Sequence, residues 1–521
     1  MSDLTSGFPK NLSYSIKELN CFSKQTVKIL SDQLGTDVNA GQIISFKLPP
    51  NSLIDMRTFS VFFDLTSGIS GGTTGVEVHS PRYTASFIEQ LNIYVNNTQV
   101  STIPYYNQLY NALADMSWGT DTTSKRFLEN YDPSVIYTYA AGSGTTLETA
   151  TGTVNYPIKA YKACVAANAG HDGAGSNGYR QFAINNWVGI LNNSSTAVWD
   201  TSDLGDVIVE IRLAPANIMF GSPPTSAYAA GATVTADTNL VGVPSYTLKN
   251  IRATMSRISF NSSEYYDLKA AKLLESSLLI GFQDFYGVKG TVQAKSANVS
   301  WNYNVNANSL DYILATVNRS DYNTFDYLQL YGSANGTTVE NYDVGGNTAG
   351  VKGYTFAEAL AKQSDATTSA TIITGYTYNK KDGDLFNQVR YFQRKASGIK
   401  TAQFAINSVM VDPYPKPPAE IYNEALISLG NKNLDITSTI HPGCLSLYHF
   451  CKYYFVHICS LQNLSGDSTF WRSGLNGNAA SINVQYNAVF DGVQTDIIQP
   501  LFFNAITRIL SVSAGRIINV V

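Results

Sequence analysis

Residues 86–116, SFIEQLNIYVNNTQVSTIPYYNQLYNALADM, hold two candidate strands, a turn and a candidate helix in close succession. Leu91, Ile93 and Val95 alternate with less apolar neighbours, which is the period of two expected of a strand with one buried face. The Asn-Asn pair at 96–97 predicts a tight turn, because asparagine tolerates a positive φ at small cost. The segment therefore predicts a pair of β-sandwich strands with a small helix packed against their end.

The helix is predicted from the residues that follow the second strand. Pro104 suits the first turn of a helix, because its missing N–H would have no partner there. Apolar residues then recur at helical spacing at Tyr105, Leu109, Ala112 and Met116. Gly119 predicts the end of this helix.

The order of these elements resembles the first jelly roll of the double jelly-roll major capsid proteins of tailless membrane-containing phages, virophages and polinton-like viruses. The segments FAINNWVGIL at 182–191 and DTSDLGDVIVEIRLAPANIM at 200–219 resemble the closing part of the same jelly roll. The resemblance covers most of the chain outside an N-terminal arm and two insertions. It implies two upright jelly rolls of eight strands each, with three chains forming a pseudo-hexagonal capsomer.

The composition of the chain favours strands and turns. Charged residues make up only 14% of the 521 residues, whereas Tyr (33), Phe (24) and Gly (39) are abundant. The formal net charge of -4 provides no basic excess, so we expect no sequence-specific nucleic-acid partner. No apolar run approaches the ~18 to 20 residues needed to cross a bilayer, and we expect a soluble protein made in the host cytoplasm. Its five cysteines are expected to be reduced.

The predicted fold class is all-β, with two side-by-side antiparallel eight-stranded jelly rolls, long loop insertions and a few short helices. An N-terminal arm is predicted at 1–35, where isolated apolar residues lie among polar ones. The remaining boundaries are a first jelly roll at 36–222 with an insertion at about 118–179, a linker at 223–245, and a second jelly roll at 246–521 with an insertion at about 332–384.

Alternation or β-branching predicts strands at 43–48, 59–65, 181–185, 206–213, 246–260, 278–286, 291–299, 309–317, 482–489 and 506–521, and helical spacing predicts a helix at 419–430. The pentapeptide QFAIN occurs twice, at 181–185 and at 403–407. Each copy follows a Gly-rich insertion. This coincidence favours an internal duplication, and it predicts that both insertions leave the molecule at the same end.

The segment HPGCLSLYHFCKYYFVHIC, residues 441–459, is the best candidate for a chemical site. On one strand, His449, Cys451, His457 and Cys459 would all face the same side. The two pairs would then be about 26 Å apart at ~3.3 Å per residue, which excludes one ion bound by all four. A two-ligand site completed by a neighbouring strand is the remaining metal hypothesis. The competing interpretation, ordinary core residues, is favoured, because free cysteine usually packs as a small hydrophobe.

Other polar groups provide weaker signals. His171 and Asp172 lie among loop glycines, Asp382 and Asp384 fit a turn, and Glu210 is expected on the outward face of a strand. The basic and aromatic run RYFQRK at 390–395 is interpreted as a subunit contact or a solvated edge rather than a nucleic-acid face. The glycines at 68–75 lack the Lys-Ser/Thr of a phosphate-binding loop. We therefore predict no catalytic residue, no metal, no cofactor and no enzymatic activity.

Two hypotheses of function remain. The first is a structural major capsid protein of an icosahedral double-stranded DNA virus, located in the virion, whose homotrimers contact neighbouring capsomers, pentons and minor capsid or cement proteins. In this hypothesis the N-terminal arm lies inside the shell and can contact an internal membrane. The alternative is a glycan-binding or glycan-cleaving β-sandwich protein such as a phage spike or lectin, because aromatic-rich sandwiches host many functions.

Overall fold

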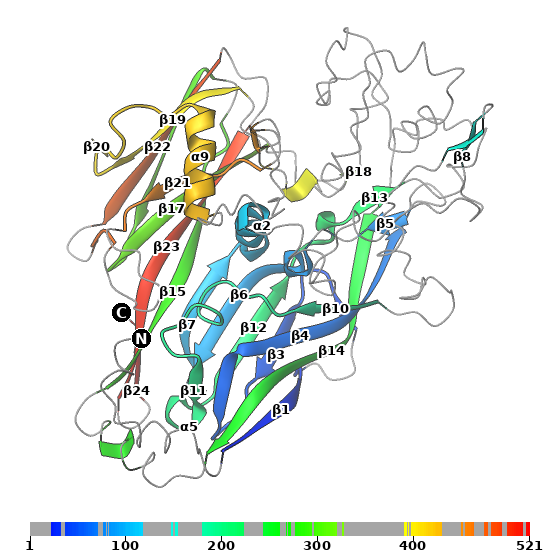
Figure 1. Cartoon of the computed structure of the whole chain (residues 1–521), viewed down its shortest axis with the longest axis vertical. Coiled ribbons are helices and arrows are strands. Elements are labelled where there is room, and N and C mark those ends of the chain that lie inside the picture. Colours follow the sequence, from blue (N-terminus) through cyan, green and yellow to red (C-terminus); the bar gives the residue numbers. More distant parts are fainter. Residues whose placement is uncertain are drawn as a thin grey trace.

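The structure is a computed structural model, shown in Figure 1. It describes residues 22–32, 37–70, 77–79, 81, 83–117, 147–149, 152–154, 180–222, 243–260, 267, 269–271, 273, 277–293, 296–319, 326–327, 390–392, 394, 398–429, 447, 450–451, 454–462, 474–477, 481–491, 498–513 and 517–520. No helix within these residues combines the length and the apolarity needed to cross a bilayer.

The first half of the chain forms a sandwich of two antiparallel sheets. The β1 sheet contains, in spatial order, β1 (Phe22–Leu30), β14 (Val243–Phe260), β4 (Leu53–Ser70) and β10 (Arg180–Ile184). The β3 sheet contains β3 (Ile43–Lys47), β12 (Val207–Leu213), β6 (Ile88–Val95) and β7 (Thr98–Pro104). Two short strands, β2 (Val38–Asn39) and β11 (Val198–Asp200), extend the β1 sheet.

The second half forms a sandwich of the same kind. The β15 sheet contains β15 (Leu278–Lys289), β23 (Ile498–Ser513), β17 (Leu310–Arg319) and β21 (His457–Ser460), and β24 (Ile517–Val520) pairs with β23. The β16 sheet contains β16 (Asn298–Val305), β22 (Ile482–Phe490), β19 (Ile399–Ile406) and β20 (Val409–Met410).

The two sandwiches share one topology. When the eight principal strands of each half are numbered in chain order, both halves give sheets of order 1-8-3-6 and 2-7-4-5. The last strand thus returns beside the first in each half, as in a jelly roll. The predicted fold class, two antiparallel eight-stranded jelly rolls, is confirmed.

Alternation along the strands explains why the sandwiches close. In β12 the residues Val207, Val209, Ile211 and Leu213 are buried, while the side chains between them face outward. The β15 sheet differs, because both of its faces are covered. On β23, Phe503 packs with the core of the first sandwich, and the neighbouring Phe502 packs with the core of the second. This sheet therefore joins the two halves.

Each jelly roll carries a helix between its fifth and sixth strands. These helices are α2 (Tyr106–Ser117) and α9 (Pro418–Leu429), and they contact each other where the sandwiches meet (Figure 1). The prediction that Pro104 opens the first helix is wrong by two residues. Pro104 is the last residue of β7, and Tyr105 turns the chain with a φ of 54° before the helix begins. Gly119 lies outside the described residues.

Several strands differ from the sequence-based boundaries. Residues 22–30, assigned to the arm, form β1, and residues 246–260, assigned to the second jelly roll, belong to β14 in the first sandwich. A jelly roll requires this, because its eighth strand must pair with its first and third strands. We propose that the domain boundary lies between Phe260 and Leu278. The strand expected at 291–299 begins only at Asn298, and the single tail strand expected at 506–521 is divided between β23 and β24.

The repeated pentapeptide does not mark equivalent positions. The first copy, at 181–185, starts in β10, the sixth strand of its jelly roll, whereas the second, at 403–407, starts in β19, the fourth strand. The equivalent of the Asn407-Ser408 turn is the Asn96-Asn97 turn, and all four residues have a φ between 48° and 67°. QFAIN is therefore not evidence of duplication. Except for the hairpin of β8 (Leu147–Thr149) and β9 (Gly152–Val154), both insertions lie outside the described residues.

Candidate functional site: the junction between the two jelly rolls

The buried charged side chains Asp115, Arg394 and Asp284 lie where the two jelly rolls meet. The β7–α2 corner of the first sandwich lies against β15 of the second. Gly287 on β15 permits this approach, since a Cβ added there would lie 3.1 Å from the carbonyl oxygen of Pro104. The sequence signal for this contact is weak, because one glycine within a strand has several explanations.

A buried hydrogen-bond network connects the two halves beside this corner. The Ser101 hydroxyl on β7 donates to Asp284 of β15 at 2.7 Å, and Arg508 of β23 forms an ion pair with Asp284 at 3.0 Å. Arg508 also donates to the carbonyl of Val100 at 3.0 Å. Burial raises the pKa of the Asp284 carboxyl above its usual range, although the contacts with Ser101 and Arg508 act in the opposite direction.

A loop of the first sandwich covers the free edge of β15. The Ser195 N–H donates to the carbonyl of Gly281 at 2.7 Å, and the Gly281 N–H donates to the Ser195 hydroxyl at 2.9 Å. The Gln283 N–H donates to the carbonyl of Asn193 at 3.2 Å. These bonds satisfy backbone groups that an edge strand would otherwise expose.

A second charged pair lies deeper in the junction. Arg394 forms an ion pair with Asp115 of α2 at 2.8 Å, and both side chains are fully buried. The Tyr83 hydroxyl donates to the other carboxylate oxygen of Asp115 at 2.9 Å. The interpretation of 390–395 as a subunit contact or solvated edge is therefore wrong for Arg394. Alternation between basic and aromatic residues gave no sign that this arginine had a buried partner in the other half of the chain.

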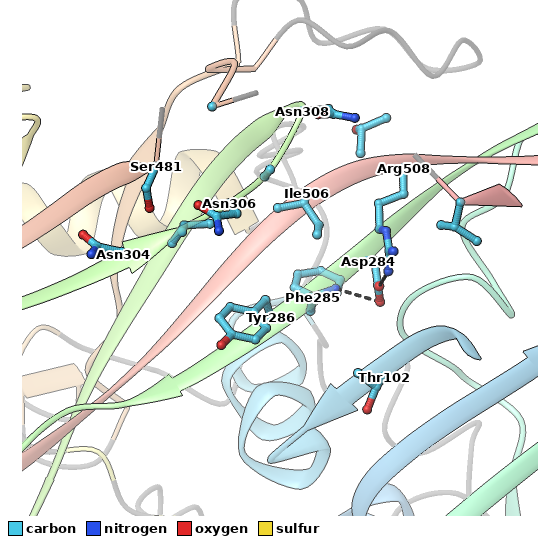
Figure 2. A pocket seen from close by; sticks show the side chains of 15 residues that line it. Thr102, Asp284, Phe285, Tyr286, Asn304, Asn306, Asn308, Ser481, Ile506 and Arg508 are labelled. Carbon is cyan, nitrogen blue, oxygen red and sulfur yellow. Dashed lines mark hydrogen bonds and ion pairs between the residues drawn. The ribbon is translucent and has the colours of Figure 1, made fainter. Parts of the chain in front are cut away.

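An open cavity of about 930 Å³ lies over the junction (Figure 2). Thr102 of β7 lines one side, and Asp284 and Arg508 lie opposite it. Further lining residues from the second sandwich are mostly uncharged, among them Tyr286, Asn304, Asn306, Asn308 and Ser481. Its walls offer amide and hydroxyl groups and one carboxylate, Asp284, which is already paired with Arg508.

The predicted His and Cys cluster does not form one strand. Cys451 has a helical backbone, and β21 begins only at His457. The His457 ring is fully buried between Phe404 and Tyr486, with Nδ1 3.3 Å from the Tyr486 hydroxyl, and burial lowers its pKa to about 3, assisted by the charge of Lys416.

Both cysteines of this segment that the structure describes are free thiols. Burial raises the pKa of Cys459 to about 12 and that of Cys451 to about 11, which disfavours the thiolate that a metal would need. His449 lies outside the described residues. In the part of the chain that the structure describes, no three His, Cys, Asp or Glu side chains come together in a metal-binding arrangement.

The remaining candidate side chains are not assembled into a site. Glu210 lies on β12 and accepts a hydrogen bond from the Asn92 amide at 2.8 Å, on the face of the β3 sheet that points away from the core. His171, Asp172, Asp382 and Asp384 lie outside the described residues. The prediction that the chain has no catalytic or metal-binding residue stays a prediction.

Comparison with known proteins gives a fold. No protein-family model matches the sequence, and no curated protein matches it. Among solved structures, VP54 of PBCV-1, fitted into a cryo-EM reconstruction of the virophage Sputnik, is 11% identical, matches over 96% of each chain and has a TM-score of 0.50. The Faustovirus major capsid protein is 10% identical, with 94% of this chain and 91% of that chain covered and a TM-score of 0.50. The chain therefore has the double jelly-roll fold of these viral major capsid proteins.

Proposed function

We propose that this chain is the major capsid protein of an icosahedral double-stranded DNA virus, and that it forms pseudo-hexagonal homotrimeric capsomers that tile the shell. The observation that carries the proposal is the pair of jelly rolls with identical strand order, held together by a buried junction. Each chain contributes two similar jelly rolls in a fixed arrangement. Three chains therefore provide six jelly rolls, which complete a six-sided unit.

The buried junction supports an architectural role. A shell subunit must keep its two halves in a fixed orientation so that contacts with its neighbours stay in register. The fully buried Asp115–Arg394 pair joins the two sandwiches, and a buried pair of this kind penalises arrangements that separate them. The hydrogen bonds from Ser101 to Asp284 and from Arg508 to the carbonyl of Val100 also cross the junction. We also propose that the protein is not an enzyme.

The proposal extends to location and partners. The protein would be synthesised in the host cytoplasm and reside in the virion, in contact with neighbouring capsomers, pentons and minor capsid or cement proteins. The N-terminal arm would lie inside the shell and contact an internal membrane where one is present. No sequence-specific binding of nucleic acid is proposed.

The test is the size and the assembly of the purified protein. Light scattering should give three times the chain mass, and electron microscopy of concentrated protein should show hexagonal lattices or shells. A monomer that forms no lattice, and whose thermal unfolding midpoint rises with a particular oligosaccharide, would instead support a glycan-binding protein. Cleavage of that oligosaccharide would contradict the structural role.

A further inference from the structure

The second sandwich ends in an edge strand with exposed apolar side chains. On β20, Val409 is 68% and Met410 51% exposed, and the next residue, Val411, is 37% exposed. Among the described strands, β20 pairs only with β19. Apolar residues on an unpaired edge favour association with another chain.

The equivalent edge of the first sandwich is already covered. Strand β7 follows the Asn96-Asn97 turn just as β20 follows the Asn407-Ser408 turn, so Val100 corresponds to Val411. Val100 is fully buried, and its carbonyl accepts a hydrogen bond from Arg508 of the second sandwich. In addition to β6, with which it pairs, β7 contacts β15, the first strand of the following jelly roll. The chain thus shows how one jelly roll docks onto the next.

In the first jelly roll, the strand equivalent to β15 is β1, and its outer edge is uncovered in the part of the chain that the structure describes. Like β15, β1 is the terminal strand of a sheet of order 1-8-3-6, and no described strand pairs with its other edge. The outward-facing side chains of β1 are exposed, namely Lys24, Thr26, Lys28 and Leu30. A second copy that placed its β20 here would repeat the contact between β7 and β15.

The charges of the two edges are complementary. The segment after β20 carries more carboxylates than ammonium groups: Asp412 and Glu424 both pair with Lys416, and Glu420 accepts a hydrogen bond from Tyr414. Strand β1 carries Lys28 and Lys24, of which Lys24 forms an ion pair with Asp55 at 3.5 Å, and it has no acidic residue of its own. An excess of negative charge on one edge and of positive charge on the other favours head-to-tail pairing over pairing of like edges.

We propose that β20 and the segment that leads into α9 of one chain dock against β1 of a second copy of this chain, and so repeat between chains the contact that β7 and Tyr105 make with β15 within one chain. This inference rests on the proposed capsomer, because three such head-to-tail contacts close a ring of six jelly rolls. The interface is heterologous, with one edge from each chain.

Two interface variants test this arrangement. In the first, Val409→Lys with Met410→Lys replaces apolar contacts by charges that repel the lysines of β1. In the second, Thr26→Glu with Lys28→Glu places acids opposite the acidic edge. The matched control is Ile517→Lys with Leu279→Lys, which changes side chains that are 64% and 61% exposed on β24 and β15. Each interface variant should raise the midpoint concentration of trimer dissociation at least about tenfold, while the control behaves like wild type.

Mixing the two interface variants gives the decisive result. In the mixture, the intact β20 edge of the second variant can dock on the intact β1 edge of the first, and the new lysines on β20 of the first variant face the new glutamates on β1 of the second. An equimolar mixture should therefore form dimers and larger species by light scattering, although neither variant does so alone. Dimers in the mixture also show that both variants are folded. Wild-type-like trimers from either variant alone, or a mixture that stays monomeric, would overturn this interface while wild-type trimers still support the capsomer. A wild-type protein that forms no trimers would overturn the capsomer itself.

Discussion

Val100 and Val411 hold the same place in the two jelly rolls, yet Val100 is fully buried and Val411 is 37% exposed. The difference comes from the strands that neighbour each residue. Strand β15 lies next to β7, whereas none of the described strands other than β19 pairs with β20. One chain therefore contains the same jelly-roll edge twice. In the first half a neighbouring jelly roll covers it, and in the second half it is exposed.

The buried Asp115–Arg394 pair should be a large contributor to stability. Arg394→Met leaves the Asp115 carboxylate buried without the positive charge of the guanidinium, and we expect the free energy of unfolding to fall by about 3 to 5 kcal/mol. Urea unfolding followed by circular dichroism measures this change. The control is Lys47→Met, which removes an ion pair of 2.7 Å whose side chains are 50% and 49% exposed and should cost less than about 1 kcal/mol. Equal losses in both variants would contradict the role assigned to the junction.

His457 should make the protein less stable in mild acid. Its pKa in the folded state is about 3, below its ordinary value of 6.5, so stability is fully present above pH 6.5 and is lost as the pH falls toward 3. Between pH 7 and pH 5 the loss from this one group should be about 2 kcal/mol. His457→Gln cannot be protonated. Urea unfolding at both pH values should therefore show a smaller acid loss for the variant, and parallel pH curves would show that the His457 ring is accessible to protons.

Gly287 should be intolerant of even a methyl group. Its added Cβ would lie 3.1 Å from the carbonyl oxygen of Pro104, so Gly287→Ala must push the β7–α2 corner away and should cost about 1 to 3 kcal/mol. Gly68→Ala is the matched control in another strand, because its Cβ would meet the Ser245 hydroxyl at an ordinary 3.6 Å. Thermal unfolding of both variants separates the two cases. A neutral Gly287→Ala would mean that the two sandwiches are not closely packed there.

Local patterns in the sequence were sufficient to predict most strands. Alternation in 206–213 predicts β12 to within a residue, and the Asn-Asn pair at 96–97 predicts a turn that the structure confirms. These signals depend on neighbouring residues alone. Such periodicity carries no information about which distant strands pair. The composition of 246–260 therefore predicts a long strand but not its pairing with β4 in the first sandwich.

The junction was largely missed for the same physical reason. Arg394 and Asp115 are 279 positions apart, and neither carries a local pattern that identifies its partner. The QFAIN repeat, in contrast, is a local pattern that suggests a relationship the fold does not have. Its two copies are identical in sequence but lie in strands that are not equivalent. The equivalent turns, Asn96-Asn97 and Asn407-Ser408, share a backbone conformation instead, because a two-residue turn selects residues that tolerate a positive φ.

The two long insertions should still emerge at the same end of the molecule, although QFAIN does not explain why. The first insertion returns to the sheet at Arg180, which pairs with Leu65 near the end of β4. The second starts near β18 (Asp326–Tyr327), which pairs with β13 (Phe220–Ser222), and β13 also pairs with β5 (Glu77–His79), the strand that follows β4. Cryo-electron microscopy of trimers with a small tag in each insertion should show both tags on one face. Tags on opposite faces would contradict this prediction.

Deletions at the two ends of the chain should have opposite effects. Removing 506–521 takes away β24 and half of β23, the strand that pairs with both β15 and β17, so the β15 sheet cannot form and we expect insoluble protein. Removing 2–20 leaves β1 and its pairing with β14 intact, so this variant should fold and form trimers. Ordering that arm costs about 1 to 2 kcal/mol per residue, which only contacts outside the trimer can offset. Light scattering should therefore give normal trimers, and electron microscopy should show few closed shells; normal shells from the 2–20 deletion would refute a role of the arm in assembly.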